Sequence, residues 1–216
     1  MKYSAIILDC DGVILDSNNL KSKAMAETVE HYGPDLVTSF VEYHRRNGGV
    51  SRYEKFKFFL KEMANSYSKS EYQRLLGKFS KLVKEKLTAV PLTDGAFEFI
   101  SECSAHSDLY VVSGGDQEEL RDVFDQRFMS SYFVDILGSP TKKNVHCERI
   151  QRRLTSKERA IFIGDSHLDY SAAIENDFDF IFLSGYTDMD NWRSFCEQNK
   201  LPNYPDFPTL KRNYEL

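Results

Sequence analysis

The sequence lacks the patterns that identify several classes of protein. Its four cysteines are scattered, with no CxxC pair, so neither a zinc site nor a disulfide framework is predicted. No apolar run is long enough to cross a membrane, and the short apolar stretch before Asp9 is too brief for the core of a signal peptide. We therefore expect a cytoplasmic protein that has no membrane partner.

Two glycine-rich phosphate-binding signatures, GxxxxGK and GxGxxG, are also absent, which excludes nucleotide-binding loops of those kinds. The formal net charge of −5 argues against nucleic acid as a partner, although a local basic pocket could still hold a phosphate. The 216 residues, 41% hydrophobic and 28% charged, are typical of a globular protein with one domain and an insertion, or with two small domains.

The strongest chemical signal lies near the start of the chain. The apolar run 6–8 predicts a strand buried on both faces of a parallel sheet, and Asp9 and Asp11 follow it directly. Ligands bind beyond the carboxyl ends of such strands, and alternate side chains of an extended segment point the same way. Two adjacent carboxylates repel unless a cation or a proton intervenes, so the pair implies a bound metal. Cys10 points the other way and should pack as a small hydrophobe.

The hydrophobic periodicity divides the chain into two parts. Residues 17–90 read almost entirely as helix, whereas strands alternate with helices from residue 91 onward, which is typical of parallel strands joined by helical crossovers. We expect an α/β core of residues 1–16 and 91–216, with helices on both faces of the sheet, interrupted by an all-helical domain of residues 17–90. The expected strands are 109–113, 133–137, 160–164 and 180–183, and the expected helices are 94–104, 116–128, 143–154 and 169–176. The proline-containing tail after residue 200 is expected to be a covering strap.

Polar residues suited to phosphate chemistry follow the expected strands. Ser113 and Gly114 offer a hydroxyl and backbone N–H groups that can hold anionic oxygens, although Ser-Gly-Gly is also a common loop before a helix. Lys142 and Lys143 lie at a helix start, where a cation opposes the helix dipole. A cluster of aspartates and phosphate would supply their counter-charge, whereas solvated surface lysines are the other interpretation.

The fourth expected strand is followed by carboxylates at Asp165 and Asp169. Both can reach the strand ends if a helix begins after Asp165. Hard oxygen ligands in this number suit magnesium, which binds one or two carboxylates together with a substrate phosphate. His167 lies between the two acidic positions, and we expect it to face solvent or to cap the helix.

Taken in order, these segments resemble the four motifs of the haloacid dehalogenase superfamily, through LDCDGVILDS, VVSGG, the lysine after GSP, and IGDSHLD. The resemblance implies a Rossmann-like core, with Asp9 as the nucleophile and Asp11 as the general acid/base. It also implies magnesium ligated by Asp9, the carbonyl of Asp11 and Asp165, with Asp169 supporting the site.

The same resemblance implies that Ser113 and Gly114 hold the phosphoryl group and that a lysine neutralises it. The GSPxxK spacing of relatives selects Lys143, but the adjacent Lys142 leaves this choice open. The role of Asp11 requires a raised pKa, which its proximity to Asp9 and Asp16 would help to supply against the pull of the metal.

The helical part resembles the cap of the phosphoglycolate phosphatase and β-phosphoglucomutase group. The segment GVSR, residues 49–52, resembles the substrate-contacting loop of the mutase, and a capping-box pattern predicts that a helix starts at Arg52. We expect residues 47–55 to cover the active site, with Arg52 and Lys55 binding an anionic or hydroxylated part of the substrate. An exposed helix start with solvated charges is the alternative.

The expected function is a magnesium-dependent phosphatase that hydrolyses a small phosphorylated metabolite, such as a sugar or sugar-acid phosphate, through an aspartyl-phosphate. A phosphomutase is an alternative, but Lys21 stands where mutases carry histidine, which favours the phosphatase. A non-catalytic phosphate-binding protein is another alternative, although the complete set of Asp9, Asp11, Lys143 and Asp165 argues against it. Dehalogenases lack the second aspartate, so Asp11 disfavours dehalogenation. The sequence identifies neither the substrate nor the oligomeric state.

Overall fold

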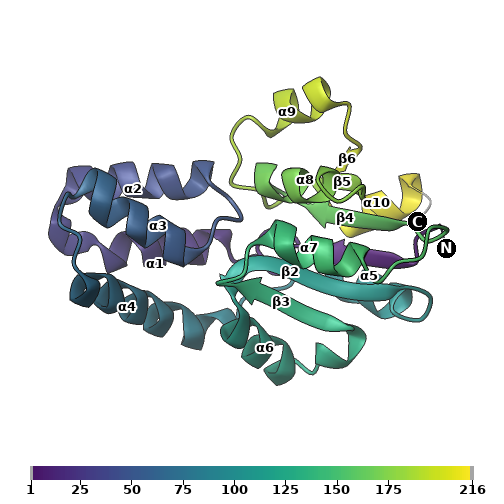
Figure 1. The fold of residues 1–216 in the computed structure, drawn as a ribbon, viewed down its shortest axis with the longest axis horizontal. Coiled ribbons are helices and arrows are strands. Elements are labelled where there is room, and N and C mark those ends of the chain that lie inside the picture. Colours follow the sequence, from purple (N-terminus) through teal and green to yellow (C-terminus); the bar gives the residue numbers. More distant parts are fainter. Residues whose placement is uncertain (1, 215–216) are drawn as a thin grey trace.

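The computed structural model describes residues 2–214, in which six parallel strands form one sheet (Figure 1). The strands are β1 (Ala5–Leu8), β2 (Asp108–Asp116), β3 (Asp135–Ser139), β4 (Ala160–Gly164), β5 (Asp179–Leu183) and β6 (Asn203–Tyr204). Their order is β3-β2-β1-β4-β5-β6, so β1 lies between β2 and β4 and the order reverses beside it. In sheets of this kind, ligands bind at the carboxyl ends of the strands where the order reverses.

Helices cover both faces of the sheet. They are α5 (Ala96–Cys103), α6 (Gln117–Gln126), α7 (Lys143–Gln151), α8 (His167–Ile174), α9 (Trp192–Asn199) and α10 (Phe207–Asn213), with the short η3 (Ser130–Tyr132). Ile6 and Leu8 of β1 belong to the apolar cluster that contains α5, α6 and α10, whereas Ala5 and Ile7 belong to the cluster that contains α7, α8 and α9. Burial on both faces explains why β1 is an unbroken apolar run. The predicted α/β fold class is confirmed.

The helical insert, residues 18–87, lies at one end of the molecule, drawn in purple and blue in Figure 1. Its elements are α1 (Asn18–Thr28), η1 (Glu30–Tyr32), α2 (Pro34–Arg46), α3 (Arg52–Phe58), η2 (Phe59–Met63, a π-helical turn) and α4 (Lys69–Leu87). Aromatic side chains fill its interior: the ring centroids of Phe40 and Phe59 are 4.7 Å apart, and those of Phe56 and Phe79 are 5.6 Å apart. The apolar interior of the insert is continuous with the apolar cluster that contains Ile6 and Leu8 of β1.

The tail after residue 200 differs from the expected strap. It forms β6, the sixth strand of the sheet, followed by α10. β6 pairs with the end of β5, where the N–H of Ser184 donates to the carbonyl of Tyr204 at 2.9 Å. Pro208 lies in the first turn of α10, which Asp206 caps. Proline is tolerated in the first turn of a helix because the N–H it lacks would have no partner there. The prolines thus mark the ends of elements, and α9, β6 and α10 were not predicted from the sequence.

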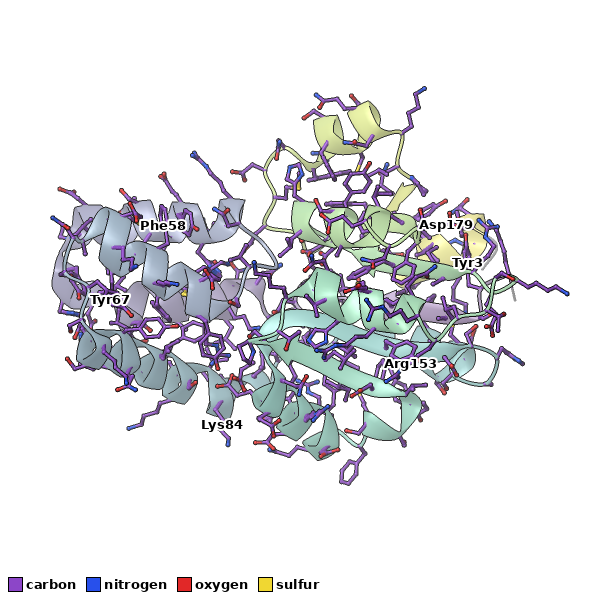
Figure 2. All side chains as sticks on the ribbon, viewed as in Figure 1. Tyr3, Phe58, Tyr67, Lys84, Arg153 and Asp179 are labelled. Atoms are coloured by element: carbon purple, nitrogen blue, oxygen red, sulfur yellow. The ribbon has the colours of Figure 1, made fainter. Side chains whose placement is uncertain are left out.

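The amino ends of the strands lie far from the helical insert, where Figure 2 shows Tyr3 and Asp179 close together. Tyr3 donates its hydroxyl to Asp179 at 2.7 Å, and Arg159 forms an ion pair with the same carboxylate at 2.5 Å. These polar groups join the start of β5 to the segments before β1 and β4. In the part of the chain that the structure describes, no helix has the length and hydropathy that a membrane span requires.

Candidate active site

Asp9 lies at the carboxyl end of β1, where the neighbouring Leu8 is paired with Val111 on one side and Ile163 on the other. Only 3% of Asp9 is exposed. After it the chain turns through Gly12, which has φ +75° and approaches Asp165 so closely that a Cβ would stand 2.3 Å from a carboxylate oxygen. Glycine is needed at this position both for the backbone angle and for the space.

Lys143 is the lysine that reaches Asp9. Its Nζ lies 2.7 Å from Asp9 Oδ1 and also forms an ion pair with Asp169, and its side chain is buried. Burial alone would lower the pKa of Lys143, but the two carboxylates outweigh burial and raise it, so the side chain is charged. Lys142 is exposed and precedes the helix. Of the two adjacent lysines, the structure therefore places Lys143 in the cluster.

Asp169 uses both of its carboxylate oxygens within the protein. Ser166 caps α8 by accepting the backbone N–H of Asp169, and one oxygen of Asp169 accepts the backbone N–H of Ser166 at 3.1 Å and its hydroxyl at 2.6 Å. The other oxygen accepts from Lys143. Because both oxygens are engaged in this way, the contacts of Asp169 are those of a residue that supports the site by fixing Lys143.

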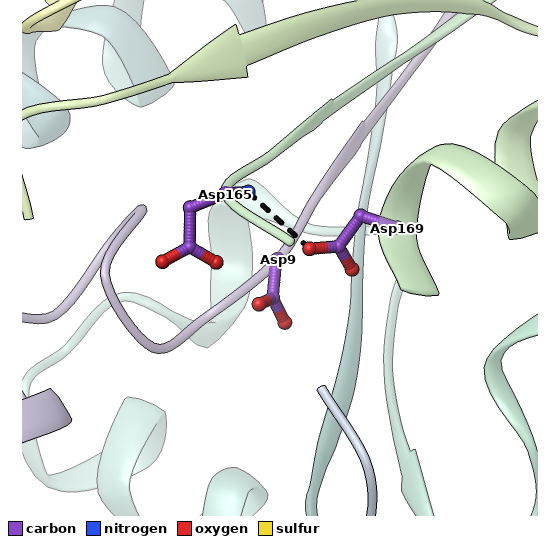
Figure 3. Close-up of side chains that lie close together, drawn as sticks. All are labelled: Asp9, Asp165 and Asp169. Atoms are coloured by element: carbon purple, nitrogen blue, oxygen red, sulfur yellow. Dashed lines mark hydrogen bonds between the residues drawn. The ribbon is translucent and has the colours of Figure 1, made fainter. Parts of the chain in front are cut away.

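Asp9, Asp165 and Asp169 each contribute an oxygen to a group whose members lie within 4.8 Å of one another (Figure 3). Burial and the mutual repulsion of these carboxylates raise the pKa of Asp9 and Asp165, while Lys143 opposes the shift. A divalent cation between Asp9 and Asp165 would offset this repulsion, and carboxylate oxygens are suitable ligands for such an ion. The two residues thus fit a metal site of the expected kind.

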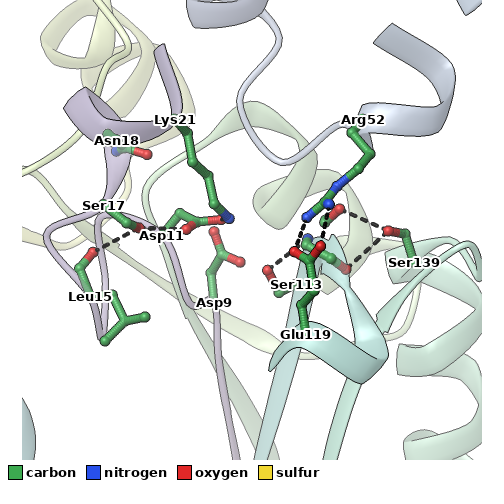
Figure 4. Close-up of polar contacts among 12 residues, drawn as sticks. Asp9, Asp11, Leu15, Ser17, Asn18, Lys21, Arg52, Ser113, Glu119 and Ser139 are labelled. Atoms are coloured by element: carbon green, nitrogen blue, oxygen red, sulfur yellow. Dashed lines mark hydrogen bonds and ion pairs between the residues drawn. The ribbon is translucent and has the colours of Figure 1, made fainter. Parts of the chain in front are cut away.

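Asp11 is held by two donors (Figure 4). Ser17 donates its hydroxyl to Oδ1 at 2.5 Å, and Lys21 donates to Oδ2 at 2.5 Å. Burial alone would raise the pKa of Asp11, but the charge and hydrogen bonds of Lys21, together with Ser17, lower it below its ordinary value. The expectation of a raised pKa is therefore wrong for this arrangement. The sequence comparison with mutases drew attention to Lys21 but did not show that it contacts Asp11.

A cavity of about 240 Å³ lies between the helical insert and the carboxyl ends of the strands. The core contributes Asp9, Asp11, Gly114, Asp165 and Asp188 to its lining, and the helical insert contributes Lys21, His44, residues 45–50, Arg52 and Lys55. Acidic groups gather on the core side and cationic groups on the side of the insert. The cavity is therefore suited to an anionic compound that also meets a metal.

The turn of residues 47–50 lies directly against the core. A Cβ on Gly114 would stand 2.0 Å from the carbonyl oxygen of Gly49, and a Cβ on Gly48 would stand 3.2 Å from Ser166 Cβ. Gly49 itself has φ +77°. The expectation that this turn covers the strand ends agrees with the structure, and the close approach depends on glycine at both surfaces.

Arg52 lines the cavity and also makes contacts that the sequence did not predict. The predicted helix start at this residue is confirmed, with Ser51 accepting the N–H of Glu54. The Arg52 guanidinium binds Glu119 of α6 through two hydrogen bonds of 2.7 and 2.5 Å (Figure 4). It also donates to Ser80 at 2.8 Å. The guanidinium thus makes three hydrogen bonds to protein acceptors, while Arg52 also lines the cavity.

A second polar contact joins α3 to the core next to the ion pair of Arg52 and Glu119. In this contact the hydroxyl of Tyr53 donates to Asp116 at 2.5 Å. Arg52 and Tyr53 are consecutive residues, and both reach acidic side chains at the start of α6. This geometry favours a role for Arg52 in holding the helical insert against the core.

Lys55 lies in the cavity wall and is buried, as is its partner His44 of α2. Its Nζ lies 2.8 Å from His44 Nδ1 and 3.2 Å from the His44 carbonyl oxygen. Burial lowers the pKa of Lys55 to about 7, and burial also holds the pKa of His44 well below its usual range, so the imidazole is neutral and accepts. His44 could not be selected from the sequence, since its position depends on how α2 packs against α3.

The remaining candidates occupy positions close to those expected. Ser113 is buried and accepts the N–H of Gly115 at 3.0 Å, next to Gly114 in the cavity wall. His167 is exposed at the start of α8, in agreement with the expectation that it faces solvent. Its ring centroid lies 4.0 Å from that of Phe195. Cys10 is fully buried, and burial raises the pKa of its thiol, so it is a packing residue.

A family model described as haloacid dehalogenase-like hydrolase matches residues 6–183. The chain belongs to this family. The match includes β1 from its second residue, β2 to β5, and every acidic or basic residue of the cluster around Asp9. A curated relative, 6-phosphogluconate phosphatase from Escherichia coli (strain K12), is 27% identical over 139 residues, which are 64% of this chain and 60% of the relative. The aligned part thus spans less than two thirds of that protein.

Solved structures share the fold. A haloacid dehalogenase-like family protein from Streptococcus pneumoniae has a TM-score of 0.71 with 20% identity, covering 99% of each chain. The CbbY protein from Rhodobacter sphaeroides, in complex with xylulose-(1,5)bisphosphate, has a TM-score of 0.70 with 18% identity, covering 96% of each chain. These likenesses extend over both the sheet and the helical insert.

Proposed function

We propose that this protein is a magnesium-dependent phosphatase that hydrolyses a small phosphorylated metabolite through an aspartyl-phosphate on Asp9. The observation that carries the proposal is the cluster of Asp9, Lys143 and Asp165 at the point where the strand order reverses, beside a cavity of about 240 Å³. The relative named 6-phosphogluconate phosphatase supports a sugar or sugar-acid phosphate as the class of substrate.

In the first step, a carboxylate oxygen of Asp9 attacks phosphorus, and the bond between phosphorus and the leaving oxygen breaks. Phosphoryl transfer of this kind depends on positioning and on neutralising the phosphoryl oxygens. Lys143, fixed by Asp169, supplies one positive charge beside Asp9. Mg²⁺ bound by Asp9, the Asp11 carbonyl and Asp165 would let a carboxylate approach an anionic phosphate. Backbone groups at Gly114 and the hydroxyl of Ser113 would hold the phosphoryl oxygens.

Asp11 would act as general acid and then as general base. Because Lys21 favours its ionised form, Asp11 is prepared for the second step, in which it takes a proton from the water that attacks the aspartyl-phosphate. In the first step Asp11 must carry a proton to the leaving oxygen. A phosphate dianion bound beside Asp11 would raise the pKa of the Asp11 carboxyl group and so favour its protonated form.

We further propose that residues 17–90 serve as a cap over a core of residues 1–16 and 91–216. The cavity lies between them, and the turn with Gly49 lies against Gly114. A closed cap excludes water until the leaving group departs. Arg52 would stabilise this closed arrangement through Glu119.

The proposal is tested by incubating the purified protein with an aryl phosphate and a panel of phosphorylated metabolites, with Mg²⁺ and with a chelator. We expect release of inorganic phosphate that requires the metal. Phosphorus NMR of hexose 1-phosphate incubations separates hydrolysis from mutase activity, since Lys21 lies where a mutase carries histidine. No phosphate release from any compound, or a predominant 6-phosphate product without free phosphate, would contradict the proposal.

A further inference from the structure

The cationic side chains of the helical insert differ in how their charge is balanced. Lys21 is paired with Asp11 and Arg52 is paired with Glu119, each with a contact of 2.5 Å. Arg45 and Arg46 are exposed to solvent at the edge of the same cavity. Lys55 is neither solvated nor paired with a carboxylate: within residues 2–214 its hydrogen-bond partners are both on His44.

The position of Lys55 is costly without a counter-ion. Only 3% of the residue is exposed, and a buried ammonium is expensive unless it is paired and hydrogen-bonded. An ammonium has three N–H donors, of which His44 accepts two. The third donor and the charge are uncompensated beside a cavity. A buried, unpaired charge in the wall of a cavity is typical of a site where a ligand supplies the missing anion.

The groups that face Lys55 from neighbouring elements leave this charge unbalanced. The charge of Lys21 on α1 lowers the pKa of Lys55, whereas the carboxylates of Asp11 and Asp188 in the core raise it. The neutral imidazole of His44 faces Lys55 from α2. Among the described residues, Lys55 forms no ion pair with either carboxylate. An anion in the cavity would gain from Lys55 a charge-assisted hydrogen bond in a poorly solvated place.

We propose that Lys55 binds a second anionic group, on the leaving-group side of the substrate, so that the enzyme prefers metabolites with a carboxylate or a second phosphoryl group over neutral phosphorylated alcohols. This inference rests on the proposed phosphatase function. The reacting phosphoryl group sits at Asp9 on the core side, and the second anion sits at Lys55 on the side of the helical insert. Lys55 is therefore a specificity residue.

Matched substrates isolate the second anion. 6-Phosphogluconate and glucitol 6-phosphate differ in having a carboxylate or a CH₂OH group at C1, and fructose 1,6-bisphosphate and fructose 6-phosphate differ in a second phosphoryl group. We expect wild-type kcat/KM to favour the anionic member of one pair by roughly 10- to 100-fold, the range of one hydrogen bond to a charged group. The pair that shows the preference identifies which anion is bound.

Two variants assign the preference to Lys55. Lys55→Met should bring the ratio of kcat/KM within a pair close to one, whereas Lys57→Met, an exposed lysine on the same helix, should leave the ratio as in the wild type. The ratio in the wild type should also fall as the pH rises through about 7, where Lys55 loses its charge. This measurement needs no variant, so it remains informative if Lys55→Met folds poorly.

The outcomes separate this inference from the proposed function. Hydrolysis of an aryl phosphate together with a ratio near one in both pairs would overturn the inference and leave the phosphatase proposal intact. A ratio retained in Lys55→Met would also overturn it. Absence of hydrolysis of the aryl phosphate and of all four metabolites would instead contradict the phosphatase proposal.

Discussion

Lys21 and Asp11 form an ion pair of 2.5 Å at the wall of the cavity, with only 10% of the lysine side chain exposed. The pair joins the first turn of the helical insert to the loop that follows β1. Because Lys21 favours the ionised form of Asp11, the acid and base roles proposed for this carboxylate depend on what else occupies the cavity.

Asp9→Asn should abolish phosphatase activity with little loss of stability. The amide keeps the shape of the side chain but is a poor nucleophile, so we expect kcat to fall by at least about 1,000-fold. Folding should tolerate the change because burial and neighbouring carboxylates already disfavour the charged form of Asp9. Phosphate release and thermal unfolding would be measured on the same preparation. Turnover close to that of the wild type would rule out Asp9 as the nucleophile.

Glu119→Gln should weaken the contact between α3 and α6. The Arg52 guanidinium would lose a charged partner, and we expect the free energy of unfolding to fall by about 1–3 kcal/mol. If Arg52 holds the helical insert closed, kcat/KM should fall for both an aryl phosphate and a larger metabolite. Glu118→Gln is the control, since Glu118 is exposed on the same helix. Improved activity on the larger metabolite would indicate instead that Glu119 withholds Arg52 from the substrate.

Gly114→Ala should prevent the closed arrangement of the turn 47–50. The added Cβ would meet the backbone oxygen of Gly49 at 2.0 Å, and no flexible side chain can give way there. We expect kcat/KM to fall by at least about tenfold through loss of positioning. Gly77→Ala is the matched control, because nothing lies within 4 Å of its added Cβ and alanine should stabilise α4 by about 1 kcal/mol. Full activity of Gly114→Ala would show that closure over Gly114 is not required.

Lys55→Met should stabilise the protein in a manner that depends on pH. In the folded protein the pKa of Lys55 is lowered from 10.5 to about 7, so the unfolded chain binds more protons between these values. The wild type therefore carries its full penalty below pH 7 and loses it as the pH rises toward 10.5. The stability advantage of the variant should be greatest below pH 7 and should decrease above it by up to about 1.4 kcal/mol per pH unit. A difference that does not vary with pH in chemical denaturation would contradict this assignment.

The parts of the fold that were predicted from the sequence are those encoded in short segments. An apolar run that ends in aspartate identifies β1 and Asp9, and β4 spans the expected residues 160–164. The choice between Lys142 and Lys143 needed the structure, since it depends on which residue of α7 points toward Asp9.

The features that were missed arise from packing between distant segments. Arg52 and Glu119 are 67 residues apart, and nothing local to either indicates that they meet. His44 contacts Lys55 only because α2 and α3 lie together in the helical insert. In the tail, short elements bounded by prolines gave too few residues for a periodic pattern, so β6 and α10 looked like irregular chain.

Asp169 has two tasks, one for each oxygen of its carboxylate. One of its oxygens completes the capping box that begins α8, and the other holds Lys143 beside Asp9. If the first turn of α8 opened, Lys143 would lose its ion pair with Asp169. The Lys143 ammonium would then no longer be held beside Asp9. Local unfolding of one helical turn would therefore switch off the charge balance of the active site, long before the sheet itself is disturbed.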